Sequence, residues 1–101
     1  MGSEMISLAG VDRTIHEPSR STILAVLSVV ESADFLYLLR ETGLTKGNLS
    51  VHLSRLEEAG YISIEKTYRG KIPLTLCRMT EAGRMAFKEY RDQLKAFVEH
   101  N

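Results

Sequence analysis

The sequence has little of several features that would assign it to a specialised class of protein. A single cysteine, Cys77, excludes an internal disulfide and fits a reducing compartment. The longest apolar run extends only from Ile23 to Val30, and it is interrupted by Ser28, so it is too short to span a bilayer. The N-terminus lacks the basic start and the cleavage pattern of a signal peptide. We therefore expect a cytoplasmic protein with no membrane partner.

Patterns that support catalysis or metal binding are also missing. The three histidines are scattered at positions 16, 52 and 100, and no cysteine or histidine pair has metal-ligand spacing. The sequence contains no glycine-rich phosphate loop and no nucleophile beside a suitable base. We expect no enzyme activity, no metal site and no cofactor, and the sequence leaves open whether a small-molecule effector exists.

The composition is that of one ordinary globular domain. The chain has 101 residues, of which 44% are hydrophobic and 26% charged, which is enough for one modest core. The formal net charge is zero, but the charges are unevenly distributed. Residues 1–39 contain two arginines against five carboxylates, whereas residues 40–78 contain seven cations against four. The middle of the chain is therefore basic, as positioning on nucleic acid requires.

Residues 45–59 have the pattern of an amphipathic helix with a small, polar outer face. Apolar residues recur at three- and four-residue spacing on its inner side: Leu49, Leu53, Leu56 and Ala59. Thr45 is a typical N-cap, and Gly60 suits the left-handed residue that ends a helix. The outer side carries Gly47, Asn48, Ser50, Val51, Ser54 and Arg55. Such short side chains suit a helix that enters a DNA groove.

The flanking segments complete a helix-turn-helix with a hairpin. A shorter helix capped by Asp34 precedes a glycine-containing link at residues 42–44, so residues 34–59 form a helix-turn-helix pattern. Residues 61–64 and 74–78 read as two strands of a hairpin that spans residues 61–78. The tip of this hairpin carries Arg69 and Lys71 around Gly70, with Lys66 and Tyr68 on the approach, and such a basic loop can reach phosphate or a minor groove.

Four segments together resemble winged helix-turn-helix transcriptional regulators of the MarR and ArsR groups, in particular a small single-domain archaeal and bacterial branch. They are DRTIHEPSR at 12–20, GLTKGNLSVHL at 43–53, LEEAGYI at 56–62 and MTEAGR at 79–84. Each segment alone is moderately specific, whereas their order and spacing together are strong. They cover most of residues 10–90.

The resemblance implies an α+β, mainly α, winged helix-turn-helix over residues 1–101. In such regulators the second helix of the motif enters the major groove and the wing touches the adjoining backbone. The chain is accordingly expected to be a sequence-specific regulator that binds double-stranded DNA as a homodimer, or else a winged-helix protein-interaction module without DNA binding. The expected DNA contacts of the recognition helix are Thr45, Lys46, Gly47, Asn48, Ser50, Val51, Ser54 and Arg55, and those of the wing are Lys66, Tyr68, Arg69 and Lys71.

Two further helices suggest where a second copy docks. Pro18 suits the first position of a helix, and the apolar residues that follow predict a core helix over 18–31 that is buried on more than one side. A C-terminal helix over 80–100 carries a long apolar stripe, and a short N-terminal helix within 5–15 continues that surface. The predicted dimer interface is Leu8, Val11, Ile15, Phe87, Tyr90, Leu94, Phe97 and Val98.

Several of these features have simpler explanations. The cations of the wing tip also suit the protection of an exposed strand edge. The C-terminal stripe also suits packing against the core of its own chain. His52 lies at the border of the apolar stripe, where a hydrogen-bonded packing role is expected, and Cys77 is expected to be a buried apolar residue. His16 and Glu17 precede Pro18, where a hydrogen bond at the start of the helix explains them.

Overall fold

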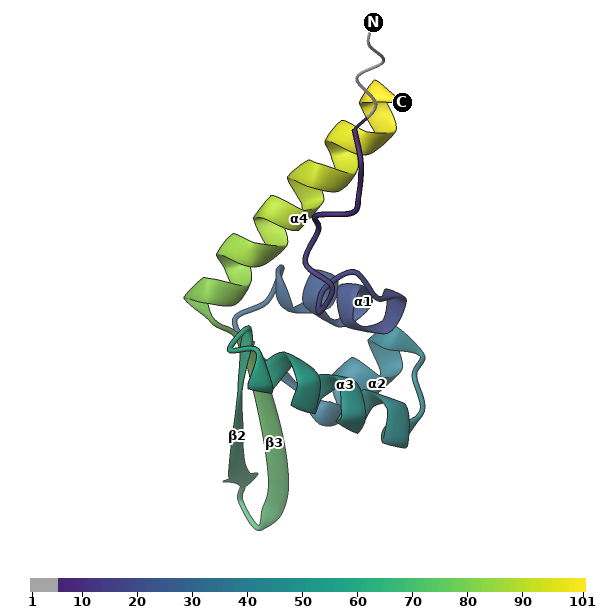
Figure 1. The fold of residues 1–101 in the computed structure, drawn as a ribbon. Coiled ribbons are helices and arrows are strands. Elements are labelled where there is room, and N and C mark those ends of the chain that lie inside the picture. The colour runs from purple at the N-terminus through teal and green to yellow at the C-terminus, as the bar shows by residue number, and fades with distance from the viewer. Residues whose placement is uncertain (1–5) are drawn as a thin grey trace, which may run out of the picture.

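The fold is known from a computed structural model that describes residues 6–101 (Figure 1). It contains four helices and a small antiparallel sheet, in the order α1 (Pro18–Leu27), β1 (Ala33–Asp34), α2 (Phe35–Thr42), α3 (Lys46–Glu58), β2 (Ile62–Arg69), β3 (Ile72–Met79) and α4 (Glu81–His100). This mainly helical α+β architecture confirms the predicted winged helix-turn-helix.

The starts of the helices follow from local capping chemistry. Asp34, Thr45 and Thr80 each have extended backbone geometry, and each side chain accepts a hydrogen bond from a backbone N–H of the first turn of its helix. Glu17 caps α1 in the same way, by accepting from the N–H of Arg20, and Pro18 follows it. The predicted helix starts at Pro18, Asp34, Thr45 and Thr80 are therefore confirmed to within one residue.

Two glycines shape the helix-turn-helix. Gly43 ends α2 at φ 73°, and Gly60 follows α3 at φ 81°. Both values lie in the left-handed region, which glycine adopts at little cost and other residues rarely enter. The first glycine turns the chain from α2 into α3, and the second turns it from α3 into the wing.

The sheet has the strand order β1-β3-β2 and is antiparallel throughout. Strands β2 and β3 pair from Ile62 opposite Met79 to Arg69 opposite Ile72, which leaves Gly70 and Lys71 as a two-residue turn. Both strands are longer than the predicted 61–64 and 74–78, because their pairing continues up to the turn and they span Ile62–Arg69 and Ile72–Met79. The sequence analysis missed β1, whose two residues pair with Leu76 and Cys77 of β3. A two-residue strand shows no alternation that periodicity could detect.

The core lies between helices α1, α2 and α3 and the inner residues of the sheet. Its fully buried side chains come from the N-terminal loop, the first three helices and β3: Ile15, Ile23, Leu24, Leu27, Leu38, Leu49, Leu56 and Cys77. Because β2 and β3 extend past this core, the far half of the hairpin projects from the body as a wing (Figure 1).

Two predicted helices differ from the structure. The core helix predicted over 18–31 ends at Leu27, where the Ser28 hydroxyl donates to the carbonyl of Ala25 and the following residues form a turn. Val29 is consequently 80% exposed and contributes nothing to the core. The N-terminal helix predicted within 5–15 is wrong for the described part, since residues 6–17 contain turns, bends and irregular chain but no helix. Residue 5 lies outside the described residues.

The local chemistry around Asp12 explains the missing N-terminal helix. Its carboxylate accepts hydrogen bonds from the N–H of Thr14, at 2.9 Å, and from that of Ile15, at 3.4 Å. An aspartate that binds the backbone so close to itself stabilises a turn in competition with a helix. The apolar spacing of Val11 and Ile15 therefore reflects two anchors of a loop.

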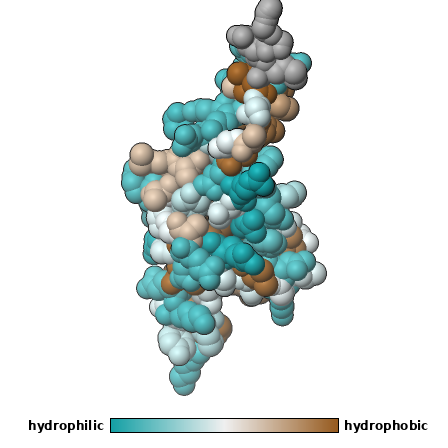
Figure 2. All heavy atoms as spheres, in the orientation of Figure 1, coloured by the Kyte–Doolittle hydropathy of each residue, from teal (hydrophilic) through white to brown (hydrophobic). Residues whose placement is uncertain are grey.

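Helix α4 projects from the body on the end opposite the wing, which makes the domain 65 Å long but only 26 by 21 Å across. The N-terminal segment runs beside the outer half of α4 (Figure 1), and Asn101 exchanges two hydrogen bonds with the backbone of Ile6. Apolar atoms remain visible at that end of the surface (Figure 2). Within residues 6–101, no helix is both long and apolar enough to cross a membrane.

Candidate nucleic-acid interface

The orientation of α3 separates its packing side from its exposed side. Leu49, Leu53 and Leu56 are buried against the other helices and the sheet. Every residue that the sequence assigned to groove contact is exposed: Thr45, Lys46, Gly47, Asn48, Ser50, Val51, Ser54 and Arg55. The structure therefore presents these side chains together along about three turns of the exposed side of the helix.

Of the two uncharged polar side chains at the start of α3, one caps the helix and the other is available to a partner. The Thr45 hydroxyl is occupied as the cap, because it accepts from the N–H of Asn48 at 3.2 Å. The Asn48 amide group itself makes no hydrogen bond within residues 6–101. An asparagine amide carries both a donor and an acceptor, so it suits the edge of a base. Val51, which is 54% exposed, adds an apolar group to the same surface.

A polar cluster joins α3 to the start of α1. The guanidinium of Arg20 contacts His52 Nδ1 at 3.1 Å and also donates to the carbonyl of Thr14. Glu17 Oε1 lies 3.8 Å from the same histidine nitrogen. His52 is thus a half-buried, hydrogen-bonded packing residue, as predicted. His16 makes a further contact of this kind, between its Nδ1 and the hydroxyl of Tyr90 at 2.8 Å.

The wing exposes the cations that the sequence assigned to it. Lys66, Tyr68, Arg69 and Lys71 are all exposed, and Lys71 lies in the turn itself. No carboxylate lies within ion-pair distance of Lys66, Arg69 or Lys71 in the described part of the chain. Their charges are therefore available to an anionic partner.

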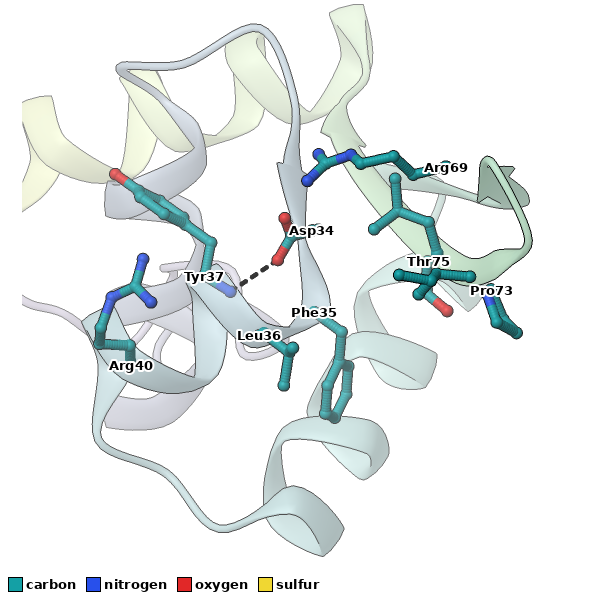
Figure 3. A pocket seen from close by; sticks show the side chains of 10 residues that line it. Asp34, Phe35, Leu36, Tyr37, Arg40, Arg69, Pro73 and Thr75 are labelled. Carbon is teal, nitrogen blue, oxygen red and sulfur yellow. Dashed lines mark hydrogen bonds between the residues drawn. The ribbon is translucent and has the colours of Figure 1, made fainter.

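The Arg69 side chain borders a groove beside the wing. Figure 3 shows the Arg69 guanidinium extending from the wing toward β1 and Asp34. It borders a groove of about 470 Å³ between the start of α2 and the edge of β3. The groove is mainly apolar, with Phe35, Leu36, Ile72 and Pro73 among its lining residues. One Asp34 oxygen is occupied as the cap of α2, with the N–H of Tyr37 at 2.8 Å.

The predicted dimer residues fall into two groups. Val11, Ile15, Phe87 and Tyr90 are buried within a single chain, because the N-terminal loop and the first half of α4 cover the core. Burial by their own chain argues against these four as contacts with a second copy. The other four are at least partly accessible: Leu8, Leu94, Phe97 and Val98. The alternative that the stripe packs on its own chain therefore holds for its first half.

Two groups have perturbed acidity, and neither belongs to this exposed surface. Burial raises the pKa of the Cys77 thiol to about 11, in agreement with its expected role as an apolar core residue. The hydrogen bond to Asp12, together with partial burial, raises the pKa of Tyr61 to about 12. No cluster of histidine, cysteine and carboxylate side chains that could hold a metal ion occurs between residues 6 and 101.

The sequence analysis missed one cationic feature beside α3. Arg13 and Arg20 line a cavity together with Arg55 of α3. Because Arg13 precedes α1 in a loop, no helical or strand periodicity links it to the recognition helix. Only the folded loop places it there.

Comparison with known families identifies this arrangement. Residues 20–98 match the family model described as a winged helix DNA-binding domain. The chain belongs to this family. The matched range includes all four helices, in part or whole, and the entire wing. The winged-helix domain is also 42% identical over 72 residues to an uncharacterised protein of Methanocaldococcus jannaschii, covering 70% of this chain and 77% of that protein.

Solved structures extend the comparison to transcriptional regulators. A transcriptional regulator homologue from Pyrococcus horikoshii superimposes with a TM-score of 0.81 and 28% identity, over 85% of each chain. NadR, solved in complex with 4-hydroxyphenylacetate, has a TM-score of 0.71. Its identity of 19% shows the shared fold alone, and the match covers 85% of this chain and 60% of that one. The family model and the Pyrococcus horikoshii homologue support a DNA-binding regulator built on the winged-helix domain.

Proposed function

We propose that this winged-helix domain is a sequence-specific transcriptional regulator that binds duplex DNA as a homodimer. The observation that carries the proposal is the outer surface of α3, which is exposed over its whole length and composed mainly of short side chains. Asn48 near its start and Val51 one turn later offer a hydrogen-bonding group and an apolar group. These are the groups that distinguish base pairs in the major groove.

The flanking charges support positioning on the DNA backbone. Lys46 lies at the start of α3, Arg55 lies in its last turns, and Lys71 occupies the wing tip. All three are exposed. Phosphate contacts by such residues fix the register of a helix in the groove, while contacts to base edges supply sequence preference. Because the net charge of the chain is zero, affinity depends on adding the contacts of two copies.

The proposed dimer uses the outer half of α4 and the N-terminal segment. Leu94 and Phe97 are only half-buried and Val98 is 73% exposed, although α4 continues well beyond the core. A second copy that covers these side chains removes apolar surface from water. A two-fold dimer that places both α3 helices on one face about 34 Å apart can enter successive major grooves.

Selection of bound duplexes from a random pool tests the proposal. The unaltered protein should enrich an inverted repeat whose half-sites are about one helical turn apart. Asn48→Ala should remove the preference at one base position in each half-site, with a loss of about 1–3 kcal/mol for the preferred base. Glu31→Gln, which changes an exposed residue outside the recognition helix, is the matched control and should keep the enriched sequence.

Two results would count against the proposal in different ways. If Asn48→Ala enriches the same sequence as the unaltered protein, Asn48 does not contact the bases that set the preference. If the unaltered protein shows no salt-dependent duplex binding at all, the protein-interaction module replaces the regulator.

A further inference from the structure

A cationic cavity lies where the N-terminal loop meets the recognition helix. Its volume is about 440 Å³, and it is lined by Arg13, Thr14, Arg20, Arg55, Glu58 and Ala59. Three arginines thus share one concave surface, contributed by the loop, by α1 and by α3. Neither the recognition-helix residues nor the wing, as assigned above, includes Arg13 or Arg20.

The arginine of α1 is already committed to the protein. Arg20 donates to the carbonyl of Thr14, and its guanidinium also contacts His52 at 3.1 Å. These contacts fix the loop against both helices. Arg20 is therefore a positioning residue that adds charge to the cavity, while the other two arginines remain available.

Arg13 and Arg55 carry the free charges. Both are exposed, and neither makes an ion pair with a carboxylate of residues 6–101. The loop that carries Arg13 is held in place on either side. Asp12 accepts from the N–H of Thr14 at 2.9 Å and from the Tyr61 hydroxyl, while the Ile15 side chain is fully buried. The Arg13 backbone is thus presented beside α3 by a well-anchored loop.

The cavity lies on the flank of α3 that carries Asn48. Asn48 and Arg55 are seven residues apart, which is close to two helical turns, so they face nearly the same direction. His52 lies between them on that flank and is the residue that Arg20 contacts. A helix that turns Asn48 toward a base edge therefore also turns this flank, with the cavity on it, toward the DNA.

We propose that Arg13 and Arg55 form a phosphate clamp, with Arg20 as the positioning residue, and that this clamp is a DNA contact separate from the wing. The inference rests on the proposed function and adds a site to it. Arginine suits the role because its planar guanidinium can donate two parallel hydrogen bonds to a phosphate group. Glu58 lines the same cavity and opposes an incoming phosphate. Removing the positive charge of Arg13 and removing the negative charge of Glu58 should therefore have opposite effects on DNA affinity.

The test measures duplex affinity of the full chain against salt concentration, with a labelled duplex of mixed sequence long enough for two subunits. Arg13→Ala should weaken binding about tenfold at low salt. It should also reduce the slope of log affinity against log salt by roughly 0.9 for each subunit bound. Glu58→Gln should strengthen binding, because it removes the negative charge that faces the phosphate.

Lys88→Ala is the matched control, since it removes an exposed cation of α4 that pairs with Asp92 at 3.0 Å. It should leave the salt slope unchanged. Melting temperatures measured for each variant separate loss of contact from loss of fold. The phosphate clamp is overturned if Arg13→Ala keeps the slope of the unaltered protein, or if Glu58→Gln fails to strengthen binding, while that protein binds duplex. Absence of salt-dependent duplex binding by the unaltered protein instead overturns the proposed function itself.

Discussion

Gly83 illustrates how one residue fixes the junction between the DNA-binding body and α4. It lies in the first turn of α4, directly against the backbone of Tyr61. A Cβ atom at this position would lie 2.1 Å from the Tyr61 carbonyl oxygen and 2.9 Å from its carbon. Backbone atoms cannot rotate away as a side chain can, so α4 approaches this closely only because residue 83 has no side chain.

We predict that Gly83→Ala lowers the free energy of unfolding by about 2 kcal/mol or more, because helix and wing must separate to admit the methyl group. This loss exceeds the gain of up to about 1 kcal/mol that alanine normally brings to a helix. Gly47→Ala is the matched control, since Gly47 also lies in a helix and a Cβ there meets nothing within 4 Å. Chemical denaturation should show opposite signs for the two variants. Equal stabilities would contradict the close approach.

At the scale of elements, the cations of the wing have two possible roles, phosphate binding and protection of an exposed strand edge. Lys71 lies in the two-residue turn and is exposed, with no ion pair in the described chain. Lys71→Ala should weaken specific and nonspecific duplex binding alike and reduce the salt slope by roughly 0.9 per subunit. Stability should change little, because the side chain buries no apolar surface.

Arg78→Ala controls for the loss of a cation from the same hairpin. Arg78 is exposed but lies at the far end of β3 from the turn, within 3.9 Å of Glu65. Its removal should leave the salt slope intact. If Lys71→Ala behaves like Arg78→Ala, the charge of the tip protects a strand edge and does not contact phosphate.

The elements also show what sequence patterns can and cannot predict. Helices α2 and α3 and the wing were predictable because caps, left-handed glycines and apolar periodicity act over a few residues, as at Thr45 and Gly60. The loop before α1 was not predictable, since the spacing of Val11 and Ile15 suits a helix equally well until Asp12 binds the backbone. Likewise, the exposed surface of α3 was predicted residue by residue, whereas the cavity with Arg13 arises only from tertiary contacts.

At the scale of the whole molecule, the elongated shape makes a second copy part of the proposed mechanism. The wing and the outer half of α4 lie at opposite ends of a domain 65 Å long. An α4 that projects so far from its own core cannot be covered fully by the short N-terminal segment beside it. The apolar side chains left there are Leu94, Phe97 and Val98.

Phe97→Asp should therefore disrupt the proposed dimer and, through it, recognition of paired half-sites. Two-fold symmetry places the new carboxylate in the interface twice, and an unpaired buried charge costs several kcal/mol, so the dissociation constant of the dimer should rise by about 100-fold or more. Met85→Asp is the matched control, because Met85 is exposed on the first half of α4, outside the predicted interface. Sedimentation at micromolar concentration should give a dimer for the unaltered chain and for Met85→Asp, and a monomer for Phe97→Asp.

The Phe97→Asp monomer should keep the melting temperature of the folded domain. It should nevertheless bind a single half-site with about half the salt slope, since one subunit displaces half the counterions. If the unaltered chain sediments as a monomer throughout, the assigned interface is wrong. If Phe97→Asp keeps full affinity for paired half-sites, DNA recognition does not depend on dimerisation.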